Sequence, residues 1–364
     1  MRYAFADSPV TYPWWTSLQE GLGEVLARHG HEAAQPLDPG IQVAFHPVSP
    51  LHPQPFPRKH RATFSIGATA LPIRPERLIS EAYPLLIRSI SNALVVTLED
   101  DPDTRWVLTP ELGCYPVSGT DAADLYENLY ERLVPLATSH LIIDNRFDPD
   151  LPEELWQGTP ATEEMAWTGR VVAEWGLLPT PFPIREVLSE EQWRHLQHLY
   201  GIGGLSYGNF SIRHDATRFW MSASGVDKGN LREVGRDILL VKGFDEASQC
   251  VLLSVPPGVK PRRVSVDAIE HHMIYSTLPE VRAMVHLHAW VTGAPVTRMN
   301  YPCGTVEMGR EVVGLLAAQP DPGHAVIGMR NHGITVTGDN FHEILERLEG
   351  RVQAQVPMQL EAVQ

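Results

Sequence analysis

The sequence predicts an α/β protein built from two domains. Its 364 residues are enough for two hydrophobic cores, and 43% hydrophobic with 20% charged residues is ordinary for a globular chain. Strand-like runs alternate with helical patterns in the first half, and an acidic, proline-containing segment near residue 148 separates the halves. We therefore expect an N-terminal Rossmann-like α/β domain over 1–147, a linker with a connecting helix over 148–184, and a second domain over 185–364.

Hydrophobic periodicity supports the first domain. Residues 15–28 carry leucine and valine at helical spacing, and Gly30 follows as a stop. A second helix is expected over 121–136. Strands are expected over 3–6, 42–45, 62–66, 93–98, 106–108 and 141–143. The alternation indicates a partly parallel sheet, and since no glycine-rich phosphate loop accompanies it, we assign this domain no nucleotide and no role.

Capping signals define the helices on either side of the linker. The connecting helix is expected over 162–174, with Thr162 as its N-cap and acidic residues in its first turn. Ser189 followed by Gln192 predicts a capping box at the first helix of the second domain. A last helix is expected over 341–353.

Charge and cysteine content narrow the classes of partner. The formal net charge is −15, which argues against nucleic acid or an anionic membrane as a general partner. No apolar run is long enough to span a bilayer, and the N-terminus lacks the hydrophobic segment of a secretory signal. The three scattered cysteines support neither a disulfide framework nor a cysteine-rich zinc site. We expect a cytoplasmic protein.

Three histidines are candidate ligands of a metal ion. His286 and His288 occupy a strand-like run over 284–290, and side chains at positions i and i+2 of a strand point to the same face. His332 follows another strand-like run, 325–329. Three neutral imidazoles with a fourth position open form a common arrangement of catalytic zinc.

The spacing alone is weak support for a metal. With 16 histidines in the chain, chance produces roughly 0.7 His-x-His pairs. A second pair, His29 and His31, lies near the N-terminus. Hydrogen-bonded structural histidines are therefore the alternative interpretation.

The surrounding motifs resemble those of the class II aldolase/adducin family, in the family's order over roughly residues 186–345. They are Gly208-Asn209-Phe210-Ser211, the segment 221–228 with Ser224-Gly225, the positions Ser265, Asp267, His271 and Tyr275, then His286-Leu287-His288, Gly304-Thr305-Val306-Glu307, and Asn331-His332-Gly333. No single motif is specific to this family, but the six motifs in the family's order are.

The resemblance implies a three-layer α/β/α domain with a mainly antiparallel sheet and one divalent metal, most often Zn²⁺, on His286, His288 and His332. It implies a lyase or isomerase (an aldolase, dehydratase, decarboxylase or epimerase). The substrate would be a small anionic molecule, a phosphorylated or carboxylated hydroxy-carbonyl compound that reacts through a metal-stabilised enediolate. It also implies a homo-oligomer, commonly a tetramer.

Two glycine-containing turns are candidates for holding the substrate's anionic end. Gly208 with Asn209, and Ser224 with Gly225, could present backbone N–H groups to a phosphate. Lys228 is a candidate charge partner. Ordinary turn chemistry and a solvated lysine are the alternatives.

One departure from the family puts the chemistry in doubt. Relatives that act as aldolases or dehydratases have a glutamate four residues after the glycine equivalent to Gly225, whereas this chain has Gly229. Four carboxylates are candidate substitutes: Asp227, Glu233, Asp267 and Glu307. Asp227, in the same loop, is the first choice as a catalytic group, with a turn residue bonding its own backbone as the alternative.

Tyr301 is a second weak catalytic candidate. It lies in a segment shorter than the one from which sugar-phosphate aldolases supply a tyrosine proton donor, and a packed tyrosine is the alternative. A non-catalytic, adducin-like binding or assembly protein that keeps the metal site is the rival function, favoured by Gly229. A purely structural zinc site is the third reading, although such sites usually contain cysteine.

Overall fold

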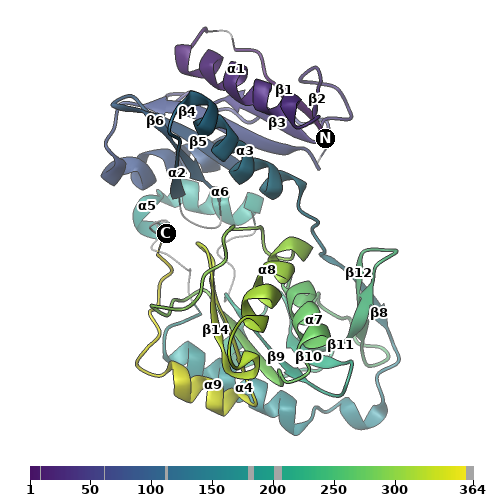
Figure 1. The fold of residues 1–364 in the computed structure, drawn as a ribbon. Helices are drawn as coiled ribbons and strands as arrows, with labels where there is room; N and C mark the ends of the chain where they lie inside the picture. Colours follow the sequence, from purple (N-terminus) through teal and green to yellow (C-terminus); the bar gives the residue numbers. More distant parts are fainter. Residues whose placement is uncertain (9, 61, 111–113, 179–183, 201–206, 358–364) are drawn as a thin grey trace. The chain divides into compact units, whose positions relative to one another are not determined.

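The computed structural model describes the whole chain except residues 9, 61, 111–113, 179–183, 201–206 and 358–364 (Figure 1). The described residues form two compact units. Unit 1 comprises those of Met1–Thr138, Pro183–Ile202 and Pro357–Gln364, and unit 2 those of Ser139–Phe182 and Gly203–Val356. Part of the linker expected over 148–184 lies outside the described residues.

Unit 1 contains a seven-stranded mixed sheet in the order β2-β1-β3-β4-β5-β6-β7. The strands are β1 (Arg2–Phe5), β2 (Glu32–Ala33), β3 (Val43–Pro47), β4 (Phe64–Leu71), β5 (Ala93–Leu98), β6 (Asp101–Leu108) and β7 (Cys114–Ser118). The first five pair in parallel and the last two are antiparallel. The predicted partly parallel sheet is confirmed, although β2 and β7 were not expected.

Helices cover both faces of this sheet. On one face α1 (Pro13–Arg28) and α3 (Ala122–Thr138) lie side by side, and their leucines join sheet residues such as Phe45 and Val95 in one apolar core (Figure 1). On the other face α2 (Leu78–Arg88) lies against β5 and contacts α6 (Glu190–Tyr200) and the short helix α5 (Ile184–Val187). The predicted capping box of α6 is confirmed, because Ser189 and Gln192 exchange backbone-to-side-chain hydrogen bonds of 2.9 and 3.3 Å.

Unit 2 contains an eight-stranded mixed sheet in the order β14-β15-β13-β9-β10-β11-β12-β8. The strands are β8 (Asp144–Asp148), β9 (Asn209–Arg213), β10 (Phe219–Ser222), β11 (Ile238–Asp245), β12 (Cys250–Ser254), β13 (Ala283–Leu287), β14 (Val326–Met329) and β15 (Gly333–Gly338). Every neighbouring pair is antiparallel except β12 with β8, which is parallel.

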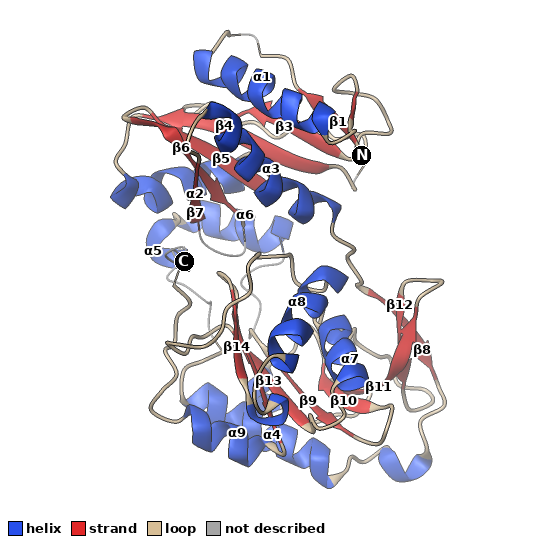
Figure 2. Ribbon diagram, viewed as in Figure 1, coloured by secondary structure: helices blue, strands red, loops and turns tan. Residues whose placement is uncertain are grey.

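This sheet also lies between helices (Figure 2). On one face α4 (Pro160–Glu174) contacts β9, and α9 (Phe341–Leu348) contacts β13 and β15. On the other face α7 (Ala268–Thr277) contacts β11, and α8 (Val306–Ala317) contacts α7 and β14. Strand side chains alternate accordingly: Phe210 meets Phe341 of α9, whereas Ser211 meets His271 of α7.

Three local expectations were wrong. Residues 141–143 form no strand: Ile142 is buried, but Leu141 makes a single bridge to Thr305 and is 52% exposed, and no ladder of backbone pairs extends over 142–143. The N-cap of α4 is Thr159 rather than Thr162, because Pro160 takes the first helical position, where its missing N–H costs nothing. Helix α9 ends at Leu348, five residues earlier than expected. No helix in the described part of the chain is both long and apolar enough to span a membrane.

Candidate metal centre

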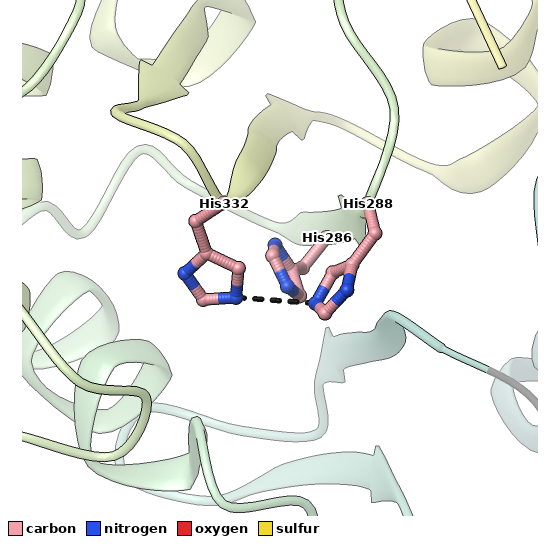
Figure 3. Close-up of side chains that lie close together, drawn as sticks. All are labelled: His286, His288 and His332. Carbon is pink, nitrogen blue, oxygen red and sulfur yellow. Dashed lines mark hydrogen bonds between the residues drawn. The ribbon is translucent and has the colours of Figure 1, made fainter. Parts of the chain in front are cut away.

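The three predicted histidines come together at the end of strand β13. His286 lies within β13, where it pairs with Asn209 of β9 on one side and Thr335 of β15 on the other. His288 lies just beyond the strand's last residue. His332 lies in the turn from β14 to β15, and the three imidazoles converge (Figure 3).

The separations between the rings suit a single ion. One nitrogen from each ring lies within 4.8 Å of the others. Nε2 of His288 and Nε2 of His332 are 3.1 Å apart, and the ring centroids are separated by 4.7 to 5.0 Å. Two histidine nitrogens on one tetrahedral zinc would stand about 3.3 Å apart, given Zn–N bonds near 2.05 Å.

The hydrogen bonding of His286 leaves its inner nitrogen available. Nδ1 donates to the backbone carbonyl of Ile334 at 3.0 Å, which places the lone pair on Nε2. That Nε2 is buried and has no hydrogen-bond partner. A second ring nitrogen held by a carbonyl is the usual support of a metal-binding histidine.

Burial keeps the triad in the form that binds metals. It lowers the pKa of His286, which the nearby Asp267 carboxylate partly opposes. Burial, reinforced by the neighbouring imidazoles, holds the pKa of His288 and of His332 well below the usual range of histidine. Neutral imidazoles carry the lone pair that a metal requires, so the residues present fit a divalent ion.

Buried polar side chains of unit 2 surround the triad on the α7 side of the sheet. Asn209 donates from Nδ2 to Asp267 at 2.7 Å, and Asp267 lies 3.9 Å from Nε2 of His286. The hydroxyl of Thr335, the strand partner of His286, donates to Glu270 at 2.8 Å. Asn209 Oδ1 and Asp267 Oδ1 have no partner. Such unsatisfied groups are uncommon in protein interiors and are found where ligands bind.

Two buried ionisable groups border this cluster. Burial lowers the pKa of Lys228 to about 8, although the Asp267 and Asp227 carboxylates oppose that shift. Burial, with the Asp267 charge, raises the pKa of Glu270 to about 8. Lys228 is only 4% exposed, so it is not the solvated lysine of the alternative interpretation.

The two candidate anion turns differ in their surroundings. Gly208 has a φ of +76°, and a Cβ there would lie 2.4 Å from the His286 carbonyl oxygen, so this glycine permits β9 to approach β13. Gly225 is exposed with a φ of +68°, and its carbonyl accepts a hydrogen bond from Arg262 at 2.8 Å. Ser224 is half-buried, and its N–H donates to the Arg263 carbonyl.

The two candidate catalytic groups of unit 2 differ in exposure. Asp227 is exposed and accepts the Gly229 N–H at 3.0 Å, capping the short helix η3 (Lys228–Asn230). Tyr301 is half-buried, and burial together with nearby glutamates raises the pKa of its hydroxyl. A Cβ at Gly229 would lie 3.1 Å from Ala173 of α4, so the missing side chain coincides with close packing of α4 on η3.

Cys303 was missed as a neighbour of the triad. Its Sγ lies 3.2 Å from Nε2 of His332. Only its position directly before the Gly304–Glu307 motif could have suggested this.

Glu307, one of the candidate carboxylates, accepts hydrogen bonds from the backbone N–H and the ring of His140, at 2.8 and 2.6 Å.

The second histidine pair has a structural explanation. His29 bonds Glu127 at 2.5 Å and stacks on Tyr130, and His31 bonds the Tyr130 hydroxyl at 2.9 Å. These contacts join α1 to α3 in unit 1 and involve no convergent nitrogens.

Comparisons with known proteins match part of this chain to one family. Residues 192–296 match the family described as "Class II Aldolase and Adducin N-terminal domain". Methylthioribulose-1-phosphate dehydratase of Klebsiella pneumoniae subsp. pneumoniae is 26% identical over 173 residues, which cover 39% of this chain and 79% of that protein. The same enzyme of Cronobacter sakazakii is 34% identical over 112 residues, covering 31% and 48%.

Two solved structures are similar over about half of the chain. L-fuculose-1-phosphate aldolase from Thermus thermophilus is 17% identical with a TM-score of 0.33, covering 51% of this chain and 86% of that one. A class II aldolase domain from Thermoplasma acidophilum is 14% identical with a TM-score of 0.34, covering 55% and 93%. The sequence matches confirm the family resemblance: residues 192–296 match the Class II Aldolase and Adducin N-terminal domain, and the chain is distantly homologous to methylthioribulose-1-phosphate dehydratases.

Proposed function

We propose that this protein is a zinc-dependent lyase or isomerase, with a dehydratase or aldolase as the best-supported type. Its substrate would be a small phosphorylated or carboxylated hydroxy-carbonyl compound. The observation that carries the proposal is the unpaired, buried Nε2 of His286 among three convergent imidazoles. Distant relationship to methylthioribulose-1-phosphate dehydratases supports lyase chemistry.

The triad and Lys228 would have different roles in this proposed site. His286, His288 and His332 would hold Zn²⁺, which supplies a Lewis acid for the oxygens of the substrate. Lys228, a buried cation beside the triad, would face the negative charge of the substrate and lower the cost of bringing it out of water.

The anionic end and the proton transfers would be handled by the loops. Backbone N–H groups at Gly208–Asn209 and at Gly225, together with the Ser224 hydroxyl, would hold the anionic end, since the Ser224 N–H already donates to the Arg263 carbonyl. Tyr301, whose phenol is protonated at neutral pH, is our candidate proton donor, and Asp227 our candidate base.

Gly229 supports a second candidate function. A Cβ at this position would lie 3.1 Å from Ala173 and 3.3 Å from Asp227, so a carboxylate here would require α4 to shift. The chain therefore lacks the acid–base group of catalytic relatives at a place where the packing also disfavours one. A non-catalytic, adducin-like binding protein that retains the metal fits this observation.

Turnover measurements separate the two functions. Zinc-loaded protein is assayed with methylthioribulose 1-phosphate, L-fuculose 1-phosphate and related ketose phosphates, each beside its unphosphorylated form. We expect turnover of at least one phosphorylated compound, lost in His288→Ala and retained in the control His52→Ala, whose side chain is exposed. Stoichiometric zinc with no turnover, but saturable binding of these compounds, would favour the binding protein.

A further inference from the structure

Cys303 contacts the histidine triad through His332. Its Sγ lies 3.2 Å from Nε2 and 3.9 Å from Nδ1 of His332. The residue is half-buried and lies between β13 and α8, outside any helix or strand.

The contact has the dimensions of two ligands that share one metal. On a tetrahedral zinc with Zn–S near 2.3 Å and Zn–N near 2.05 Å, a sulfur and a nitrogen stand about 3.6 Å apart. The observed 3.2 Å is slightly shorter, as is the 3.1 Å between the nitrogens of His288 and His332. Both distances end on the same atom, Nε2 of His332, so the Cys303 sulfur approaches that nitrogen about as closely as the His288 nitrogen does.

The donor set also favours a thiolate. Three neutral imidazoles leave the full double positive charge of a divalent ion at the site, and one thiolate halves it. Nε2 of His286 is buried and has no hydrogen-bond partner. No protein group therefore donates a hydrogen bond to this nitrogen, whose lone pair is available to a metal. The cysteine and this unpaired nitrogen are independent indications of one ligand.

We propose that Cys303 is the fourth protein ligand of the metal, so that the resting centre is a closed His₃Cys site. The proposal rests on the metal site of the proposed function. Catalytic zinc sites keep one position open for substrate, whereas closed sites are inert. Binding of a substrate oxygen would then require the centre either to release the Cys303 thiolate or to accept a fifth ligand, so Cys303 would limit access to the metal.

Cobalt spectroscopy tests this ligand directly. Metal-free protein is titrated with Co²⁺, which gives visible absorption when bound in a tetrahedral site and a near-ultraviolet sulfur-to-metal charge-transfer band only when a thiolate is bound. The wild type should show both signals, saturating at one ion per chain. Cys303→Ser should keep the visible absorption and lose the near-ultraviolet band. Cys114→Ser and Cys250→Ser, at buried cysteines elsewhere, should keep both signals.

The outcomes distinguish this proposal from the metal site itself. Visible absorption without a charge-transfer band in the wild type, or a band that survives in Cys303→Ser, would overturn the role of Cys303 and leave the triad intact. No cobalt binding in any variant would overturn the metal site. If Cys303→Ser does not fold, alkylation of the wild type decides: zinc should slow iodoacetamide modification of Cys303 at least tenfold, and an unchanged rate would refute ligation.

Discussion

Each unit buries a histidine in its sheet, but the two histidines have different surroundings. His46 of unit 1 lies on β3, where its Nε2 is 3.1 Å from the hydroxyl of Ser91 and 3.3 Å from that of Ser65. His286 of unit 2 lies on β13, and its Nε2 has no partner. Burial lowers the pKa of both side chains. Burial and a shifted pKa therefore do not by themselves mark a functional site.

The difference lies in what each ring faces. Hydroxyl groups satisfy His46, so it behaves as a structural polar residue. His286 faces two more imidazoles, and both Nε2 of His286 and Nδ1 of His288 are buried without a hydrogen-bond partner. A cluster whose hydrogen bonds cannot all be made within the protein requires something from outside, and for three imidazoles a metal ion is the natural choice.

The largest expected effect is on metal affinity. His286→Ala removes one of three ligands and should abolish measurable zinc binding, whereas His46→Ala should leave the zinc affinity unchanged and only destabilise unit 1. Competition with a chromophoric chelator measures both affinities. Equal zinc affinity in His286→Ala and the wild type would remove the distinction between the two histidines.

A backbone substitution tests the support beneath the triad. Gly208→Ala places a Cβ against the His286 carbonyl at a φ of +76°, and should lower the free energy of unfolding by about 2–4 kcal/mol. Gly225→Ala has a similar φ of +68° but open space, and should cost about 1 kcal/mol. Denaturant unfolding compares the two. Equal losses would show that the approach of β9 to β13 is not tight.

The pH dependence of stability isolates His46. Burial, with the Arg58 charge, lowers its pKa to about 4 from 6.5, so the folded state favours the neutral ring. The resulting stability is complete above pH 6.5 and is lost as the pH falls toward 4. Between pH 7.5 and pH 5 the wild type should lose about 2 kcal/mol more unfolding free energy than His46→Asn. Urea unfolding at the two pH values checks this, and identical losses would contradict it.

The smallest effect concerns two strained residues. Ile90 of unit 1 has a φ of +50° and Asn331 of unit 2 a φ of +53°. A β-branched residue is poorly suited to this conformation, whereas asparagine tolerates it. Ile90→Gly should therefore gain about 1 kcal/mol of thermal stability, and Asn331→Gly should change it little. Calorimetry measures both, and a loss of stability in Ile90→Gly would mean that its packing outweighs the strain.

Sequence patterns predicted those elements whose structure depends on neighbouring residues in the chain. Strand β5 was predicted with its observed bounds, since 93–98 is a continuous buried apolar run, and the capping box of α6 follows from two side chains three residues apart. The parallel pairing of β8 with β12 was not predictable, because residues 144–148 are polar and carry no strand signal. Their position depends on a partner about a hundred residues away.

The metal site, like the fold, was predictable from the sequence only in part. Strand periodicity predicted that His286 and His288 share a face, although β13 ends at Leu287. His332 could be joined to them only through the family's motif order, because spacing within one strand says nothing about a distant turn. The only sequence signal for Cys303 is its position directly before the Gly304–Glu307 motif, since its place beside His332 depends on the path of an irregular segment.

The most direct test of the account is the metal content of the protein purified without a histidine tag, wild type beside His288→Ala. Elemental analysis should find about one zinc or other divalent ion per wild-type chain and none in the variant. Absence of metal from the wild type even after incubation with zinc, or an equal content in His288→Ala, would contradict the metal centre on which the proposed function depends.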